Sequence, residues 1–433
     1  MKILFENADI LLRNESHYFV LNKAYLAIDG KYISYIGKDK PNDRYDLVKD
    51  YSNKLLMPGL INAHTHSPMV FLRGLGEGNK LDKWLYDYVY PTEARLTPEI
   101  ISAASYYAIL ELLASGVTSF TDMYFYPEET AKAVEKSGIK ANITKFIRCF
   151  DENQKIEESE IPGSVKFYEE WNGKSDGRIK VDFGIHAEYT NKKHIVQEYS
   201  RICKEKNARM HIHLSETKKE VDDCIEKYGV SPVKWFENLG TFDNLTSAGH
   251  VVWPEEDDFQ ILKKHNVTVI HNPSSNMTLG SGFAPVSKML RMGIDVALGT
   301  DGAASNNNLN MFEEMHMCVM LPNGFHLDPQ YLSCESVLNM ATINGAKSQG
   351  RNDTGSLEKG KCADIIALDM EKIHLYPTFD YPALLCKSAQ AADVCMTMVD
   401  GKILYENGEY LTLDKAKIKG DFKTLVENFY DIK

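Results

Sequence analysis

Eight short apolar stretches recur between residues 55 and 302, and most of them end in polar residues that commonly bind metal ions. Segments with helical character separate them, such as EIISAASYYAILELLAS and IVQEYSRICKEKN. This alternation is typical of βαβ units and a parallel sheet, and eight such units are what a (β/α)8 barrel requires. The expected strands are LLMPGLINA, VTSFTDM, KANITKFI, KVDFGIHAEY, ARMHIHLSE, LTSAGHVV, VTVIHNPSSN and IDVALGTDG.

The two ends of the chain have a different pattern, in which short strand-like runs alternate with turns. Examples are YFVLNKAYLAIDGKYISYIG near the start and VCMTMVDGKILYENGEYLT near the end. Such runs predict antiparallel strands, and we expect both ends to pair in one small unit. The sequence therefore predicts an α/β protein with a TIM-type (β/α)8 barrel of residues 57–357 and a β-sandwich built from residues 1–56 and 358–433.

Charge and cysteine content exclude several classes of protein. The net charge is −12, and no dense Lys/Arg cluster is interleaved with aromatic residues, so nucleic-acid or acidic-membrane binding is not expected. No apolar run has membrane-spanning length, and the N-terminus lacks a signal-peptide pattern. The eight cysteines contain no close pair, which argues against a disulfide framework. We expect a cytoplasmic protein with reduced thiols, and homo-oligomers by analogy with other barrels only.

The polar residues at the strand ends are the candidates for a functional site, because active sites of such barrels lie at the C-terminal ends of the strands. His64 and His66 form the strongest pair. Positions i and i+2 of an extended chain point to the same face, so both imidazoles can bind one cation. The alternative is that two polar residues merely finish a strand.

The fifth strand adds two histidines and an acid. His211 and His213 share a face but lie at different depths, so we assign His213 to the metal and His211 to the barrel interior. Glu216 follows where the chain turns, in the place that a proton-shuttling carboxylate needs. The alternative is an acid in the first turn of a helix capped by Ser215, since SETKKE resembles a capping box.

Asp301 completes a ligand set of three imidazoles and one carboxylate, which leaves a divalent cation with net positive charge and room for water. His250 ends the sixth strand, and three roles remain open for it: a fourth nitrogen ligand, a base beside the metal, or a buried structural histidine. The fourth strand offers His186 and Glu188 but no lysine to bridge two metals, so we expect one metal ion. Zinc is the default, with iron, manganese and nickel as alternatives for the same donors.

The motifs MPGLINAHTH, HIHLSE, SAGH and LGTDGAASNN together resemble the amidohydrolase superfamily, within it the branch of 5'-methylthioadenosine/S-adenosylhomocysteine deaminases. The similarity runs nearly end to end, through GSLEKGKCADIIALD. It implies metal ligation by His64, His66, His213 and Asp301. It also implies that Glu216 and His250, with Asp301, assist proton transfer.

The resemblance also implies a substrate site. The segment 67–97 is long for a βα loop, and DKWLYDYVYPTEARLT within it is similar to the substrate-binding lid of adenosine-type deaminases. By that likeness Glu93 accepts hydrogen bonds from the ribose hydroxyls, Trp84 packs against the 5' substituent and His186 lies near the base. The alternative for Trp84 and Glu93 is an amphipathic helix with one core aromatic residue and one solvated acid.

One region departs from the family pattern. Members that hold the homocysteine tail use arginines after the third strand, where Arg148 is the only candidate in this chain and acids surround it. A shorter 5' group, methylthio or deoxy, is therefore favoured over S-adenosylhomocysteine.

The resulting hypothesis is a hydrolytic deaminase that converts a 5'-modified adenosine, or adenosine itself, to the inosine analogue and ammonia. Two alternatives remain at this point. One is a deaminase or chlorohydrolase of another heterocycle, such as guanine or an s-triazine, and the other is a non-catalytic metal-binding scaffold.

Overall fold

The computed structural model describes residues 1–15 and 17–432. The remaining two, Ser16 and Lys433, fall within the ranges predicted for the β-sandwich and lie outside the described residues.

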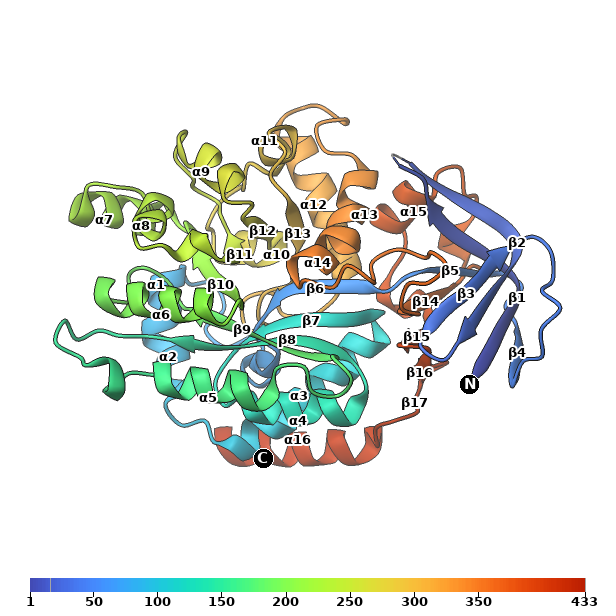
Figure 1. Ribbon diagram of the computed structural model, residues 1–433, viewed down its shortest axis with the longest axis horizontal. Helices are drawn as coiled ribbons and strands as arrows, with labels where there is room; N and C mark the ends of the chain where they lie inside the picture. Colours follow the sequence, from blue (N-terminus) through green and yellow to red (C-terminus); the bar gives the residue numbers. More distant parts are fainter. Residues whose placement is uncertain (16, 433) are drawn as a thin grey trace.

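Eight parallel strands form the predicted barrel, which occupies the centre of Figure 1. They follow one another in sequence order from β6 to β13. The strands are β6 (Leu60–Thr65), β7 (Val117–Met123), β8 (Lys140–Ile147), β9 (Ile179–Ile185), β10 (Arg209–Leu214), β11 (Leu245–His250), β12 (Thr268–His271) and β13 (Val296–Leu298). Nearly all of their residues are buried, because helices cover the outer face and side chains fill the interior.

The barrel closes between its first and last strands through side chains as well as backbone. The Asn62 side chain donates to Thr300 Oγ1 at 2.7 Å and accepts from the Thr300 backbone amide at 3.0 Å. The Asp301 amide donates to the His64 carbonyl oxygen at 3.0 Å. Gly299 permits this approach, since a Cβ there would lie 2.7 Å from that same oxygen. The closure therefore brings two predicted metal ligands together.

Helices connect the strands, and the two that the sequence analysis predicted are α3 and α6. Thr97 caps α3 by accepting a hydrogen bond from the Ile100 amide, and Pro98 begins the helix. The helices are α3 (Pro98–Ala114), α4 (Pro127–Ser137), α5 (Ile161–Trp171), α6 (Lys193–Glu205), α7 (Lys218–Tyr228), α8 (Pro232–Asn238), α9 (Asp258–Lys264), α10 (Pro273–Thr278), α11 (Val286–Arg291), α12 (Met311–Phe325), α13 (Cys334–Ala341), α14 (Ile343–Ser348), α15 (Tyr381–Lys387) and α16 (Lys415–Tyr430).

The long segment between β6 and α3 is mostly helical rather than an open loop. It contains a 3-10 helix, Ser67–Leu72, and then a run of helical turns over the cleft. These turns are α1 (Leu81–Trp84), a π-helical turn (Leu85–Val89) and α2 (Tyr90–Glu93).

Strands from both chain ends form a separate sheet, seen at the right of Figure 1 with the first strands in blue and the last in red. The N-terminal and C-terminal parts join where β5 pairs antiparallel with β14. Side chains from β1, β2, β5, β14 and β15 pack in one apolar core of this sheet. The strands are β1 (Lys2–Arg13), β2 (Tyr18–Asp29), β3 (Tyr32–Gly37), β4 (Leu47–Asp50), β5 (Lys54–Pro58), β14 (Ile365–Asp369), β15 (Val394–Val399), β16 (Lys402–Glu406) and β17 (Glu409–Tyr410).

One predicted strand proves to be two. The stretch LLMPGLINA was expected to run as a single barrel strand, but β5 belongs to the terminal sheet and β6 to the barrel. Pro58 and Gly59 separate them. Pro58 has no amide hydrogen to continue a ladder, and a Cβ on Gly59 would lie 2.2 Å from the Thr118 side chain. The chain therefore turns from one sheet to the other at this point.

Barrel and terminal sheet are also linked by buried charge. Lys140, at the start of β8, pairs with Asp364 and Asp400 at 2.6 Å each. The last helix, α16, leaves the sheet and packs on the barrel side, where Phe422 stacks on Tyr107 of α3 at 4.1 Å. Within the described residues, no helix combines the length and apolar character needed to cross a bilayer.

Candidate metal centre and active site

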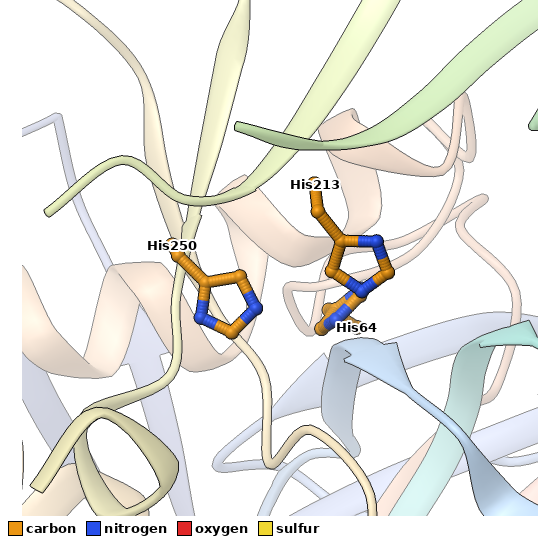
Figure 2. Close-up of side chains that lie close together, drawn as sticks. All are labelled: His64, His213 and His250. Carbon is orange, nitrogen blue, oxygen red and sulfur yellow. The ribbon is translucent and has the colours of Figure 1, made fainter. Parts of the chain in front are cut away.

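The residues predicted to bind a metal lie together at the C-terminal mouth of the barrel. Asp301 Oδ1 lies 3.4 Å from His64 Nε2 and 3.2 Å from His66 Nε2. His213 Nε2 lies 3.2 Å from His66 Nε2. The ligand atoms of His64, His213 and His250 also lie within 4.8 Å of one another. Figure 2 shows these last three imidazoles facing a common point.

Hydrogen bonds on the far side of the rings fix which nitrogen faces this point. His66 Nδ1 donates to the Met123 carbonyl oxygen at 2.5 Å, and His213 Nδ1 donates to the His186 carbonyl oxygen at 2.8 Å. Because a carbonyl can only accept, each Nδ1 carries a hydrogen and each Nε2 is the nitrogen that faces the cluster.

His64 is oriented in the same way by another histidine. Its Nδ1 lies 2.7 Å from His211 Nε2, and His211 Nδ1 lies 2.7 Å from Ser247 Oγ. The buried His64 Nε2 has no hydrogen-bond partner within the described residues. His64 Nε2 thus faces the cluster, with Asp301 Oδ1 3.4 Å away. His211 lies in the barrel interior, as the sequence analysis predicted, and its contact with His64 Nδ1 orients that ring.

The short distance between His66 Nε2 and His213 Nε2 requires a positive charge, because two facing lone pairs repel. A second proton on His66 is one solution. Burial lowers its pKa, but the hydrogen bond and charge of Asp301 outweigh that effect and raise the value to about 9. A divalent cation between these atoms would also supply the positive charge, and it could accept the Nε2 atoms and the Asp301 carboxylate as ligands at the same time. These residues therefore fit a metal ion.

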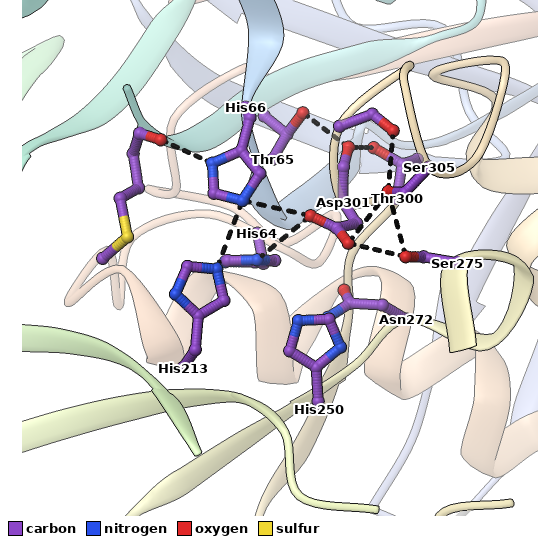
Figure 3. A network of polar contacts seen from close by, with 12 residues as sticks. His64, Thr65, His66, His213, His250, Asn272, Ser275, Thr300, Asp301 and Ser305 are labelled. Carbon is purple, nitrogen blue, oxygen red and sulfur yellow. Dashed lines mark hydrogen bonds and ion pairs between the residues drawn. The ribbon is translucent and has the colours of Figure 1, made fainter. Parts of the chain in front are cut away.

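Asp301 is held by two serines, as Figure 3 shows. Ser275 Oγ donates to Asp301 Oδ2 at 2.6 Å, and Ser305 Oγ donates to the same oxygen at 3.1 Å. The other carboxylate oxygen of Asp301, Oδ1, therefore remains available to face His64 and His66. Burial opposes ionisation, but the close contacts with His64 and His66 hold the pKa of Asp301 well below its usual range.

Glu216 faces the cleft and does not serve the following helix. The cap of α7 is Thr217, whose side chain accepts from the Glu220 amide at 3.1 Å, so the alternative that Ser215 caps this helix is wrong. The Glu220 carboxylate in turn accepts from the Glu216 amide at 2.8 Å. Burial, with the charges of Asp301 and Glu220, raises the pKa of Glu216 well above its usual range.

His250 lies between the metal cluster and Glu216. Its Nδ1 donates to Asn276 Oδ1 at 2.9 Å, and its Nε2 lies 3.8 Å from Glu216 Oε2. Burial lowers the pKa of His250, so the ring is neutral near pH 7.

A cleft opens above the cluster, and every predicted substrate residue lines it. These residues are Trp84, Glu93, Arg148, His186 and Glu216. Burial raises the pKa of Glu93 to about 7, although the Tyr124 hydroxyl and Arg148 oppose the shift. Trp84 is 5% exposed and donates from Nε1 to the Leu75 carbonyl oxygen at 2.9 Å.

Arg148 places its guanidinium over two aromatic rings at the edge of the cleft. The distances to the ring centroids are 4.9 Å for Phe125 and 5.4 Å for Phe146. Its backbone amide, not its side chain, bonds to Glu160. Among the described residues, no carboxylate forms an ion pair with this guanidinium.

Several residues of the site were missed by sequence reasoning. The sequence analysis assigns VTVIHNPSSN only to a barrel strand, yet this stretch supplies Ser275 and Asn276, which hold Asp301 and His250. Because these residues follow β12, the rule that placed the other candidates at strand ends could have found them. Tyr124 and Tyr189, which also line the cleft, carried no distinct signal.

Comparisons with known proteins give a consistent result. Residues 55–404 match the model of the Amidohydrolase family. A 5-methylthioadenosine/S-adenosylhomocysteine deaminase from Thermoanaerobacter pseudethanolicus is 41% identical over 99% of both chains. A 5'-deoxyadenosine deaminase from Methanosarcina acetivorans is 41% identical over 98% of both chains. Among solved structures, an adenosine deaminase from Xanthomonas campestris with bound zinc superposes with a TM-score of 0.93, at 27% identity and 99% coverage of both chains.

Proposed function

This chain is a member of the amidohydrolase family and an aminohydrolase, and from that premise we propose that it deaminates adenosines modified at the 5' position. The names of its relatives support 5'-methylthioadenosine and 5'-deoxyadenosine as substrates. Adenosine and S-adenosylhomocysteine are further candidates. The reaction replaces the amino group on C6 of the base with oxygen and releases ammonia.

The observation that carries this proposal is the pair of facing Nε2 atoms of His66 and His213, 3.2 Å apart beside a buried carboxylate. We infer that one divalent cation, zinc in the first instance, is held there by His64, His66, His213 and Asp301. When bound, such an ion supplies Lewis acidity that generates a nucleophile from water at neutral pH. Iron, manganese and nickel accept the same donors.

Glu216 is proposed as the general acid. Its raised pKa keeps a proton on the carboxyl near neutral pH, and that proton can be donated to N1 of the purine. Protonation at N1 draws electrons from C6 and prepares that carbon for attack. The Glu216 carboxylate then takes the proton of the hydroxyl group formed on C6 and passes it to the departing amine. The proton that water gave to His250 or Asp301 restores the acid form of Glu216.

His250 and Asp301 are proposed as acceptors of the proton that water loses. Asn276 fixes the His250 tautomer, so its unprotonated Nε2 faces Glu216 and the cleft. Asp301 stays ionised because of the histidines around it. Both groups can therefore take a proton at the moment of attack.

The walls of the cleft are proposed to select the substrate. Glu93 accepts hydrogen bonds from the ribose hydroxyls, Trp84 packs against the 5' substituent and His186 lies near the base. Arg148 is half-buried and already covers two aromatic rings, which supports an uncharged 5' group better than a long charged tail.

We further propose that the protein works in the cytoplasm on a small-molecule substrate. All eight cysteines are free thiols, which fits a reducing compartment. Association into a homo-oligomer remains a proposal by analogy with other barrels.

The test is a steady-state screen of the metal-replete protein for ammonia release, and for chloride release where the s-triazine carries chlorine. The panel contains 5'-methylthioadenosine, 5'-deoxyadenosine, adenosine and S-adenosylhomocysteine, together with guanine and an s-triazine. We expect turnover of the 5'-modified adenosines and loss of it in the Glu216→Gln variant. No ammonia from any nucleoside would overturn the substrate assignment, and a preference for guanine or the triazine would favour the heterocycle alternative.

A further inference from the structure

A second cavity, of about 580 Å³, opens at the N-terminal ends of the barrel strands. It is lined by residues at or near the starts of β9 to β12, including Lys180, Arg209 and Thr268, and by Gly350 after α14. We call it the basal cavity. Lys180 lies at the start of β9 and His186 directly after its end. At a rise of about 3.3 Å per residue, this stretch of β9 separates the basal cavity from the metal cluster by roughly 20 Å. It is therefore distinct from the active site.

Cations dominate the lining of the basal cavity. Lys180, Arg209 and Lys347 all contribute to it, against the single carboxylate of Asp182. Lys347 is neutralised by an ion pair with Asp295. Asp182 is buried and accepts two hydrogen bonds from the Asn142 side chain, at 3.1 and 2.9 Å.

Arg209 and Lys180 converge at Gly350, and the charge of the buried Asp182 acts on both. Lys180 Nζ donates to the Gly350 carbonyl oxygen at 2.6 Å. A Cβ on Gly350 would lie 3.5 Å from Arg209 Nη1 and 3.7 Å from Lys180 Nζ. Within the part of the chain that the structure describes, neither side chain forms an ion pair, and the buried Nε of Arg209 has no hydrogen-bond partner.

A third cation lies directly behind this pair. The Arg351 guanidinium donates to three backbone carbonyls, at 2.9 Å for Gly177, 2.9 Å for Ala141 and 2.7 Å for Arg178. It forms no ion pair within the described residues, although the charges of nearby carboxylates, Asp364 first, favour its charged form. Burial, together with the charges of Arg351 and Arg209, lowers the pKa of Lys180 to about 8. Partly buried cations that repel one another are costly unless an anion joins them.

We propose that the basal cavity binds a small organic oxyanion, whose phosphate or carboxylate group is held by Arg209 and Lys180. The planar fork of Arg209 suits two oxygens of such a group, and Lys180 adds a point charge. The volume is that of a small-molecule site and far exceeds one phosphate ion. Tyr168 and Asn266 line the remaining wall, where the rest of the ligand would lie.

The test is thermal unfolding and calorimetric titration of the metal-replete, full-length protein with inorganic phosphate and with succinate, against chloride at equal ionic strength. We expect a saturable rise in Tm with phosphate, with succinate or with both, because a ligand of the native state stabilises it. A response to phosphate alone identifies a phosphate ester, and a response to succinate alone identifies a carboxylate. Equal responses support the shared oxyanion chemistry. No saturable response to either anion overturns the proposal.

Variants locate the binding. Arg209→Gln and Lys180→Met should each weaken anion binding at least about tenfold, the effect of losing one charge-assisted hydrogen bond. Lys423→Gln, at a side chain that is 75% exposed on α16, is the matched control and should bind as the unmodified protein does. Circular dichroism and metal content establish that each variant is folded. If Arg209→Gln does not fold, anion binding by Lys180→Met tests the proposal alone. Unchanged anion binding in either folded variant overturns the proposal.

Discussion

The backbone amide of Asp301 donates a hydrogen bond to the carbonyl oxygen of His64 at 3.0 Å, so the last strand of the barrel meets the first at the metal cluster itself. The Thr65 hydroxyl strengthens the junction by donating to the Asp301 carbonyl oxygen at 2.9 Å. The geometry of the proposed metal ligands is therefore a consequence of how the barrel closes.

Gly299→Ala should disrupt this junction. The added Cβ would lie 2.7 Å from the His64 oxygen and 2.6 Å from Asn272 Oδ1, so β13 must move away from β6. We expect a loss of about 1–3 kcal/mol in unfolding free energy from overpacking, together with weaker metal binding. Urea unfolding and metal titration measure both. The control is Gly420→Ala in α16, where a Cβ meets nothing within 4 Å and alanine should add up to about 1 kcal/mol. Equal effects of the two substitutions would argue against the closure account.

His211→Ala should weaken metal binding although His211 is not a proposed ligand. It leaves His64 Nδ1 buried without its partner, so the ring loses the bond that fixes its orientation and tautomer. We expect metal affinity to fall about 10–100-fold, measured by competition with a chromophoric chelator. His271→Ala is the matched control, since it removes a buried imidazole from β12 whose Nδ1 bonds to nothing in the described residues. A comparable loss in both variants would mean that cavity formation, not orientation, causes the effect.

Glu93→Gln separates a nucleoside site from a free-base site. Glutamine keeps the shape of the side chain but loses the charge that strengthens hydrogen bonds from ribose hydroxyls. We expect kcat/KM for 5'-methylthioadenosine to fall about 10–100-fold, equivalent to about 1.5–3 kcal/mol, with metal content unchanged. Any turnover of a free base should hardly change. An unaltered kcat/KM for the nucleoside would remove Glu93 from the substrate site.

Stability should fall as the pH rises toward 8 because of Glu314. Burial raises the pKa of its carboxyl from 4.5 to about 8, and it accepts hydrogen bonds from Asn306 Nδ2 at 2.6 Å and from the Ser274 amide at 3.2 Å. Between those pH values the folded state binds more protons than the unfolded state. The contribution is therefore complete below pH 4.5 and is lost as the pH passes through about 8. Urea unfolding at several pH values between 4.5 and about 8 should show this slope in the parent and a shallower one in Glu314→Gln. Identical slopes would contradict it.

The sequence predicted most of the barrel because local patterns determine its strands. KANITKFI coincides with β8, and the polar residues that follow the apolar runs lie at the mouth as expected. What the sequence could not show depends on contacts between distant residues. The split of LLMPGLINA rests on the pairing of β5 with β14, which only the folded chain establishes. The support of His64 by His211, and the basal cavity around Arg209, likewise arise from packing that no local pattern encodes.

The central claim is that one divalent cation is held at the closure of the barrel, and element-specific anomalous scattering from crystals of the zinc-loaded protein tests it most directly. The account predicts a single anomalous peak about 2.0–2.2 Å from the Nε2 atoms of His64, His66 and His213 and from a carboxylate oxygen of Asp301. Two adjacent peaks, or a peak that these four side chains do not surround, would contradict it.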